Sequence, residues 1–317
     1  MRMRRAVSAL LSVYVSVPVI LYLFPWILGQ LIYAHLVRFP FFVDLSQPED
    51  LLNHTHNFYL DTEEGVSVGV WHTLPAGQWE EAAEKSAEWY QRTLGHGQPV
   101  IIYLHGNLGT RAINHRVQLV KILSAAGYHV FSLDYRGFGD SSGEPSEAGL
   151  TRDAVSLYHW VKSHSGVSLV CLWGHSLGTG SVHLLQAKLS SSRSAVDALI
   201  LEAPYTRIGD VVVNHPLSKV RPSLLWNALE RNNIVFANDE NLKTLSSPLL
   251  ILHAEDDYMV PHHMGLKVQP PQSALPTPFS WWMSLPRCRS TISFSLCSFM
   301  KSHSRPREND TPAFRWR

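Results

Sequence analysis

Ser176 stands between two glycines, in the sequence Gly174-His175-Ser176-Leu177-Gly178. The residues before it, 169–173, suit a buried strand, and residues 181–189 are typical of a helix. A strand, a sharp turn and a helix are the context of a nucleophile elbow, which strains the serine backbone and exposes its hydroxyl. We therefore expect Ser176 to be an acyl-transfer nucleophile rather than an incidental serine in a glycine-rich turn.

A second glycine-containing segment follows another apolar run. Residues 100–104 suit a strand covered on both faces, and they lead into His105-Gly106-Asn107. In serine hydrolases a His-Gly loop after this strand supplies one backbone N–H to the oxyanion hole, and the residue after the nucleophile supplies another. We expect the N–H groups of Asn107 and Leu177 to fill these roles.

These segments belong to an alternation of strands and helices. Strands are predicted at 100–104, 129–135, 169–173, 198–204 and 248–253, a strand pair over 57–72, and helices at 117–126 and 151–163. This order predicts an α/β protein with a doubly wound, mostly parallel sheet, whose ligands bind beyond the carboxyl ends of the strands. Asn107, Ser176 and Asp257 all follow predicted strands, and an insertion near 205–247 is expected to cap the site.

The N-terminus carries the signature of a membrane anchor. Residues 1–5 are a basic tip, and residues 6–37 contain no Asp, Glu, Lys or Arg, which exceeds the ~20 apolar residues that span a bilayer. The run is too long for a cleaved signal peptide and lacks the polar face of an ordinary amphipathic helix. Because the basic residues precede it, the N-terminus should be cytosolic and the rest lumenal or extracellular, where Asn53-His54-Thr55 is a glycosylation acceptor.

The composition argues against several other functions. The 27 basic and 26 acidic residues leave a net charge of +1, so nothing points to a nucleic-acid partner. The 17 histidines and 3 cysteines show no metal-ligand spacing, and the cysteines cannot form a disulfide framework. We therefore expect no metal and no organic cofactor.

Several blocks of the chain, within roughly residues 18–267, resemble the membrane-anchored serine hydrolases of the alpha/beta-hydrolase domain-containing 12 group. The blocks that carry this resemblance are 41–45, 53–55, 69–73, 105–107, 134–137, 174–180, 236–241 and 253–257. The resemblance implies an α/β-hydrolase domain over 38–267. It also implies acyl-ester hydrolysis of lysophosphatidylserine or monoacylglycerols at a lipid surface, with the catalytic domain on the lumenal side of the endoplasmic reticulum membrane.

The same resemblance assigns the catalytic groups. It makes Ser176 the nucleophile, and it makes Asp257 the acid that orients the catalytic histidine, since Val260 and Pro261 complete the family's Asp-x-x-Val-Pro pattern. Asp256 is the alternative acid. A hydrolase of non-lipid esters or peptides is the alternative within the same reaction class.

After Lys267 the resemblance ends. The family continues with a helix, a last strand, a histidine-bearing loop and a closing helix, whereas residues 268–317 are rich in Pro, Ser and Arg and are expected to be a divergent, disordered tail. The α/β-hydrolase fold is thus expected to be incomplete at its C-terminal end. His303 is the remaining weak candidate for the catalytic base. If no histidine completes the triad, the alternative is a catalytically dead, membrane-tethered binding or regulatory protein.

Overall fold

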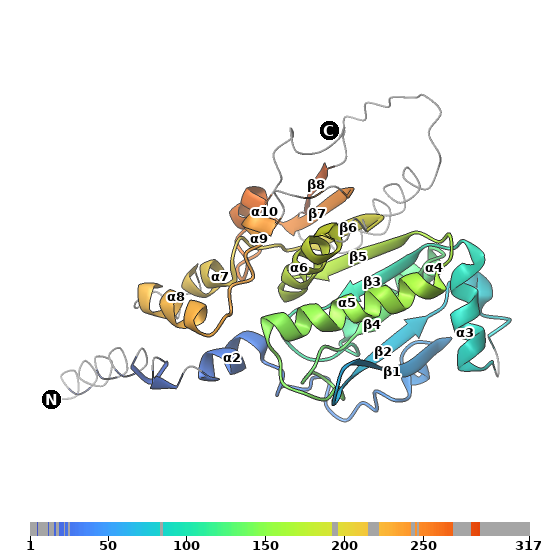
Figure 1. Cartoon of the computed structure of the whole chain (residues 1–317), viewed down its shortest axis with the longest axis horizontal. Coiled ribbons are helices and arrows are strands. Elements are labelled where there is room, and N and C mark those ends of the chain that lie inside the picture. Colours follow the sequence, from blue (N-terminus) through green and yellow to red (C-terminus); the bar gives the residue numbers. More distant parts are fainter. Residues whose placement is uncertain are drawn as a thin grey trace. The chain divides into compact units, whose positions relative to one another are not determined.

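A computed structural model describes residues 26–82, 85–191, 196–214, 222–241, 245, 247–268 and 280–285, with a few residues before 26. Its centre is an eight-stranded sheet in the order β1-β2-β4-β3-β5-β6-β7-β8 (Figure 1). The strands are β1 Thr55–Glu63, β2 Val66–Thr73, β3 Val100–Leu104, β4 His129–Leu133, β5 Val170–His175, β6 Ala198–Glu202, β7 Leu249–Ala254 and β8 Ser280–Leu285.

The sheet is mixed but mostly parallel. β2 runs antiparallel to both β1 and β4, while the pairs from β4 through β3, β5, β6 and β7 to β8 are parallel. The β1–β2 hairpin turns at Gly65, whose φ of 74° suits a residue without a Cβ. The parallel part confirms the predicted doubly wound arrangement, and β1 with β2 confirms the predicted strand pair.

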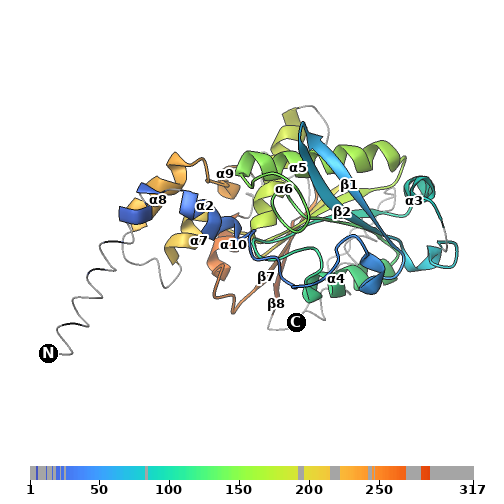
Figure 2. The ribbon, with the colours of Figure 1, turned by 90° about the horizontal axis from the view of Figure 1, so that it is seen from below.

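Helices cover both faces of this sheet. The α-helices of the described residues are α2 Trp26–Tyr33, α3 Ala87–Thr93, α4 Asn114–Ala125, α5 Glu147–His164, α6 Leu177–Ser191, α7 Ile208–Asn214, α8 Pro222–Arg231, α9 Asn238–Asn241 and α10 His262–Val268. Figure 2 shows α5 and α6 on one face and α4 on the other. α5 begins four residues before the predicted start, because the Ser146 hydroxyl accepts a hydrogen bond from the Gly149 N–H at 3.1 Å and caps the helix.

The core explains why the central strands are continuous apolar runs. Every residue of β3 and β4 is buried, and the side chains of Ile102, Leu172 and Leu199 belong to one cluster with 0% exposure. Such strands are covered on both faces, as in other parallel sheets. The carboxyl ends of β3, β5 and β7 are thereby held at one edge.

The C-terminal segment differs from the prediction. Ser280–Leu285 forms β8, which pairs in parallel with the whole of β7, from Leu249↔Ser280 to Ala254↔Leu285. The expectation of a disordered tail from 268 onward is therefore wrong for this segment, and the sheet extends past the predicted domain limit at Lys267. The stretch 291–296 and His303 lie outside the described residues.

The described end of the predicted anchor is α2. One side of this helix packs into the main core, where Leu28, Ile32 and Tyr33 are buried, while Trp26 and Leu31 are exposed. Most of residues 6–25 lie outside the described residues. Within the part of the chain that the structure describes, no helix is both long and apolar enough to cross a membrane.

Candidate active site

Ser176 lies at the turn between β5 and α6. Its φ of 50° is in the left-handed region, which is rare for a residue with a side chain and is typical of a nucleophile elbow. The Ser176 N–H donates to the Glu202 carbonyl oxygen at the end of β6, at 2.9 Å, and the Thr179 N–H donates back to the Ser176 carbonyl oxygen at 2.9 Å. The strained backbone is thus fixed from both sides, as the sequence context predicts.

Two glycines let this turn form. A Cβ added at Gly178 would lie 2.0 Å from the Leu104 carbonyl oxygen, and one added at Gly174 would lie 2.6 Å from the Gly178 carbonyl oxygen. Any side chain at either position would push α6 away from β3 and β5. The motif therefore reflects a close backbone approach and not merely a flexible turn.

The elbow meets the loop that follows β3. A Cβ at Gly106 would lie 3.4 Å from the Ser176 Cβ, so this loop passes directly beside the nucleophile. Asn107 is exposed in the loop, and Leu177 is buried at the first residue of α6. The structure thus brings together the segments that carry both predicted oxyanion donors.

Arg116 anchors the same loop and was not recognised from the sequence. Its guanidinium is buried in α4 and donates to the carbonyl oxygens of Leu108 at 2.7 Å, Thr110 at 2.8 Å and Gly106 at 3.4 Å. Burial lowers the pKa of Arg116, so these carbonyl dipoles compensate a charge held away from water. An arginine has two terminal nitrogens in a fixed planar fork, which lets it bind carbonyls that lie apart from one another, but no sequence motif marks this role.

A buried ion network lies on the other side of the loop. The Arg111 guanidinium donates to Asp134 and to Asp140, at 2.7 Å in each case, and His105 Nε2 lies 3.1 Å from Asp134. Burial alone would raise the pKa of Asp134, but Arg111 and then His105 hold it below its ordinary value. His105 therefore orders the loop through a carboxylate instead of facing the nucleophile.

The predicted acid follows β7. Asp257 is half-buried, and its Oδ1 accepts the N–H groups of Met259 and Val260, both at 2.9 Å. Its Oδ2 lies 3.9 Å from His253 Nε2, which itself donates to the Val260 carbonyl oxygen at 2.8 Å. Asp256, the alternative, is exposed. These contacts fix the orientation of the Asp257 carboxylate.

The catalytic base stays a prediction from the sequence. Within the described residues the Ser176 hydroxyl makes no hydrogen bond to another side chain, and His303 lies outside them. His303 is the last histidine of the chain and follows β8, the last described strand. The described residues also contain no group of three or more His, Cys, Asp or Glu side chains that could hold a metal ion.

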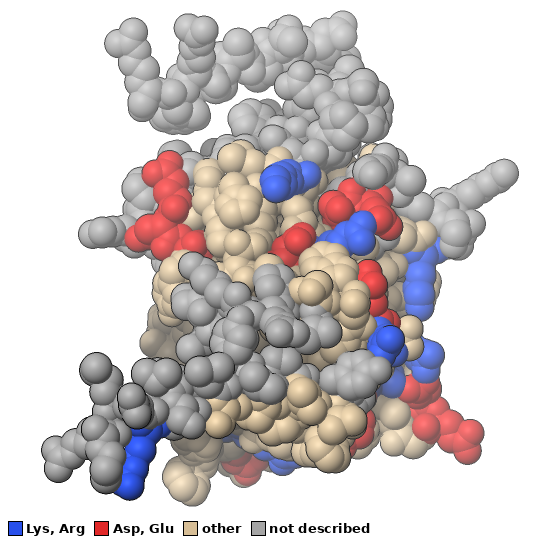
Figure 3. All heavy atoms as spheres, turned by 90° about the vertical axis from the view of Figure 1, so that its left-hand side faces the viewer, with Lys and Arg blue, Asp and Glu red and all other residues tan. Residues whose placement is uncertain are grey.

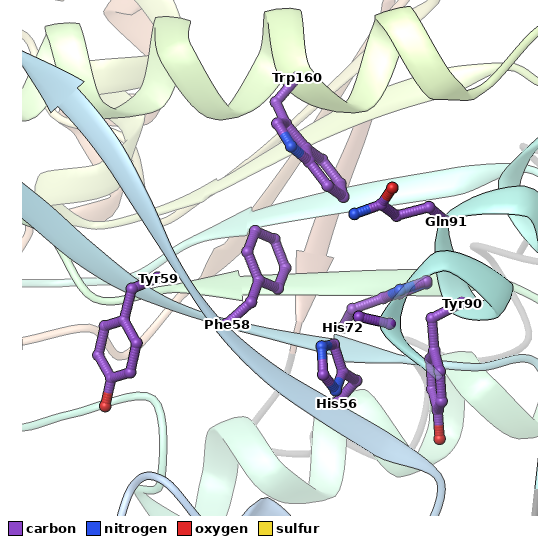
Figure 4. A pocket seen from close by; sticks show the side chains of 8 residues that line it. His56, Phe58, Tyr59, His72, Tyr90, Gln91 and Trp160 are labelled. Atoms are coloured by element: carbon purple, nitrogen blue, oxygen red, sulfur yellow. The ribbon is translucent and has the colours of Figure 1, made fainter. Parts of the chain in front are cut away.

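A pocket of about 220 Å³ lies elsewhere in the domain. Its walls include His56, His72, Tyr90 and Trp160, drawn in Figure 4. His72 Nε2 lies 3.0 Å from Nδ1 of His129, the first residue of β4, whereas Ser176 follows the carboxyl end of β5. Since β4, β3 and β5 are parallel, the pocket is at the opposite edge of the sheet and is separate from the candidate site.

Comparisons with known proteins agree with this geometry. A family model described as the alpha/beta hydrolase fold matches residues 99–232. The chain is 50% identical over 274 residues to the lysophosphatidylserine lipase ABHD12 of Danio rerio, covering 84% of this chain and 72% of that protein. It is 47% identical over 270 residues to protein ABHD12B of Homo sapiens, covering 83% and 75%.

Solved structures resemble the fold at low identity. An alpha-beta hydrolase from Vibrio vulnificus has a TM-score of 0.65 at 17% identity, covering 87% of this chain and 92% of its own. The Pyrococcus furiosus esterase Pf2001 has a TM-score of 0.60 at 16% identity, covering 84% and 97%. At such identities the likeness supports the α/β-hydrolase fold alone.

Proposed function

The chain belongs to the ABHD12 family of α/β-hydrolases, and from this premise we propose that it is a membrane-anchored serine lipase that cleaves the acyl ester of lysophosphatidylserine. The main support is the backbone of Ser176, which has a φ of 50° at the nucleophile elbow. The chain that carries this elbow is 50% identical over 274 residues to a lysophosphatidylserine lipase. Monoacylglycerols are the second substrate class, because they present the same acyl ester on a smaller head group.

The reaction follows from the positions of the donors. The Ser176 oxygen attacks the acyl carbonyl and gives its proton to the base, while the Asn107 and Leu177 N–H groups receive the oxyanion. The tetrahedral intermediate expels the glycerol oxygen of the head group, which takes the proton from the base. Water then repeats the attack on acyl-Ser176 and releases the fatty acid.

We propose Asp257 as the acid that orients the catalytic base. His303, the weak candidate for that base in the sequence, stays a prediction. The support for Asp257 is the pair of backbone N–H groups that fix its carboxylate. Asp256 is exposed and is the weaker choice.

We further propose a single-pass orientation in the endoplasmic reticulum membrane, with residues 1–5 cytosolic and the catalytic domain lumenal. Asn53 supports this orientation, since it lies exposed in the turn before β1, where an oligosaccharide would fit. Protease added to sealed microsomes should leave the region after Phe39 intact, and glycosidase should increase gel mobility. Digestion of that region would contradict the proposed orientation and indicate a cytosolic catalytic domain.

A second candidate is a catalytically dead, membrane-tethered binding protein. The observation that favours it is the divergence of the sequence after Lys267, where the family carries its histidine-bearing loop. A serine without a base keeps a high pKa and is a weak nucleophile.

Substrate turnover by the whole chain distinguishes the lipase from the catalytically dead binding protein. Residues 1–317 are expressed in membranes beside Ser176→Ala and His303→Ala, and fatty-acid release is measured from lysophosphatidylserine, monoacylglycerol and a short non-lipid ester. The lipase proposal predicts release from the lipids that Ser176→Ala abolishes. Loss of release in His303→Ala as well would identify His303 as the base. Equal release by wild type and Ser176→Ala, at matched protein levels, would support the binding protein. A preference for the short ester would remove the lipid assignment.

A further inference from the structure

Large apolar side chains are exposed in the segment that follows α2. They are Leu36, Val37, Phe39, Phe41 and Phe42, and with Leu108 of the loop after β3 we call them the apolar rim. Phe42 is 107% exposed and Phe41 61%. Soluble proteins rarely leave contiguous apolar groups uncovered, so this surface requires a partner.

The rim is attached to the catalytic loop by the backbone. The Thr110 N–H donates to the Phe39 carbonyl oxygen at 2.9 Å, and a Cβ at Gly109 would lie 2.6 Å from the same oxygen. The Thr110 and Leu108 carbonyls are in turn held by Arg116. A fixed chain of contacts therefore joins Phe39, through the Asn107 loop, to Ser176.

The charge pattern around the rim indicates what covers it. From Ala6 to Val43 the only Asp, Glu, Lys or Arg is Arg38, which is exposed within the rim, and the first acidic residue is Asp44. Aromatic rings beside a single cation match the boundary between acyl chains and phosphate head groups. Phe39 and Phe41 also contact each other edge to face, with ring centroids 5.7 Å apart.

The rim is also continuous with the uncharged run. Residues 6–25, mostly outside the described structure, lead into α2, and one side of α2 packs into the core through Leu28 and Ile32. The uncharged run 6–37 therefore includes Leu36 and Val37 of the rim. Figure 3, which views the domain from the side of α2, α7 and α8, shows uncharged side chains over much of the described surface below its middle.

We propose that the apolar rim docks into the surface of a phospholipid bilayer and so holds the Asn107 loop at the level of the head groups. Arg38 then lies among the lipid phosphates, and the Phe41 and Phe42 rings lie among the upper parts of the acyl chains. A consequence, which rests on the proposed function, is that a lysolipid reaches Ser176 from the bilayer without crossing water.

Site-directed spin labels test this docking without any need for hydrolysis. The full chain, with Cys288→Ser and Cys297→Ser and with the buried Cys171 retained, is reconstituted in phosphatidylcholine–phosphatidylserine vesicles. A nitroxide is placed at Phe42→Cys or Phe41→Cys. Val167→Cys is the matched control, because Val167 is 88% exposed and precedes β5, at the other edge of the sheet.

The expected result is that labels at 41 and 42 relax more with oxygen, which concentrates in lipid, than with a water-soluble nickel chelate. The label at 167 should show the reverse. Equal behaviour at 42 and 167 would overturn the proposal, and so would protection of 42 from both reagents, which would mean that protein, such as a second copy of the chain, covers the rim.

A variant with two introduced negative charges supplies a second readout. Phe41→Asp with Phe42→Asp should return a label at Leu36→Cys to water, whereas Val167→Asp should not. Both phenylalanines are exposed, so the fold should be retained. Lysophosphatidylserine hydrolysis is measured on the same vesicles. Labels exposed to lipid without hydrolysis would contradict the proposed function but not the docking. Hydrolysis with labels exposed to water would contradict the docking but not the proposed function.

Discussion

Among single residues, Arg116 stands out because its buried guanidinium donates hydrogen bonds to backbone carbonyl oxygens. Those carbonyls belong to Gly106, Leu108 and Thr110, on both sides of Asn107, and accept at distances of 2.7 to 3.4 Å. Because each peptide unit is planar, holding these carbonyls also fixes the peptide planes beside the proposed oxyanion donor Asn107. We therefore regard Arg116 as a positioning residue for the oxyanion loop.

Replacing Arg116 should lower kcat far more than it raises KM. Arg116→Lys cannot span three carbonyls, and Arg116→Met leaves them without donors, so we expect losses approaching the ~10²- to 10³-fold seen when an oxyanion donor is removed. Arg152→Met, at an exposed arginine, is the control. The readouts are kcat and KM at equal folded protein. A change confined to KM would show that Arg116 only shapes substrate binding.

Asp257 and Asp256 form a natural pair for a charge test. Asp257→Asn keeps an oxygen for the Met259 and Val260 N–H groups but removes the carboxylate, so the fold should persist while hydrolysis falls by about 10²- to 10⁴-fold. Asp256→Asn should retain substantial hydrolysis, since that side chain is exposed. Similar rates for both variants and wild type would refute the assignment.

At the scale of elements, local patterns located most of the sheet, because buried parallel strands are continuous apolar runs. β8 was not predicted, because polar and apolar residues do not alternate in Ser280–Leu285 and the segment lies between Pro278 and Pro286. The stretch 291–296 looked more like a strand because it alternates. What makes β8 a strand is the free edge of β7, a long-range partner that a local pattern does not contain.

Sequence motifs marked some residues of the candidate site and not others. The placement of Ser176 and Leu177 at the turn after β5 was predictable because an elbow needs glycines at fixed spacing, and that of Asn107 because a His-Gly segment follows a buried strand. Their catalytic roles stay predictions. Arg116 was not predictable, because its partners are backbone groups whose positions depend on the fold. Motifs record local backbone constraints, while contacts across the fold leave no spacing in the sequence.

Gly178→Ala tests the close packing of α6 on β3. Its Cβ would lie 2.0 Å from the Leu104 carbonyl oxygen, so the helix must shift, and we expect about 1–3 kcal/mol of destabilisation together with slower acylation of Ser176. Gly77→Ala is the control, because a Cβ there meets nothing within 4 Å. Thermal unfolding and labelling rates are the measurements. Unchanged values for Gly178→Ala would mean that the elbow tolerates a side chain.

At the scale of the whole molecule, buried imidazoles tie stability to pH. Burial lowers the pKa of His129 and of His183 to about 4, with a neighbouring His96 contributing at His129. Between that value and 6.5 the unfolded chain binds protons that the folded chain does not. The free energy of unfolding should therefore fall as the pH drops through this range, by up to about 1.4 kcal/mol per pH unit for each histidine.

Urea unfolding at several pH values between 7.5 and 5 measures this slope. His183→Gln should make the slope shallower, whatever it does to stability at pH 7.5, and Val167→Ser, an exposed position that does not titrate, should leave it unchanged. A slope that His183→Gln does not alter would show that His183 is protonated equally in both states.

Ser176 is proposed to be an activated nucleophile in a lipid-cleaving site. To test this, membranes containing the full chain are treated with a fluorophosphonate probe, with and without excess lysophosphatidylserine, and the adduct is located by mass spectrometry of peptides. We expect one adduct on Ser176 that the lysolipid suppresses and that Ser176→Ala lacks. A folded wild-type chain with no adduct, or an adduct that persists in Ser176→Ala, would contradict this proposal.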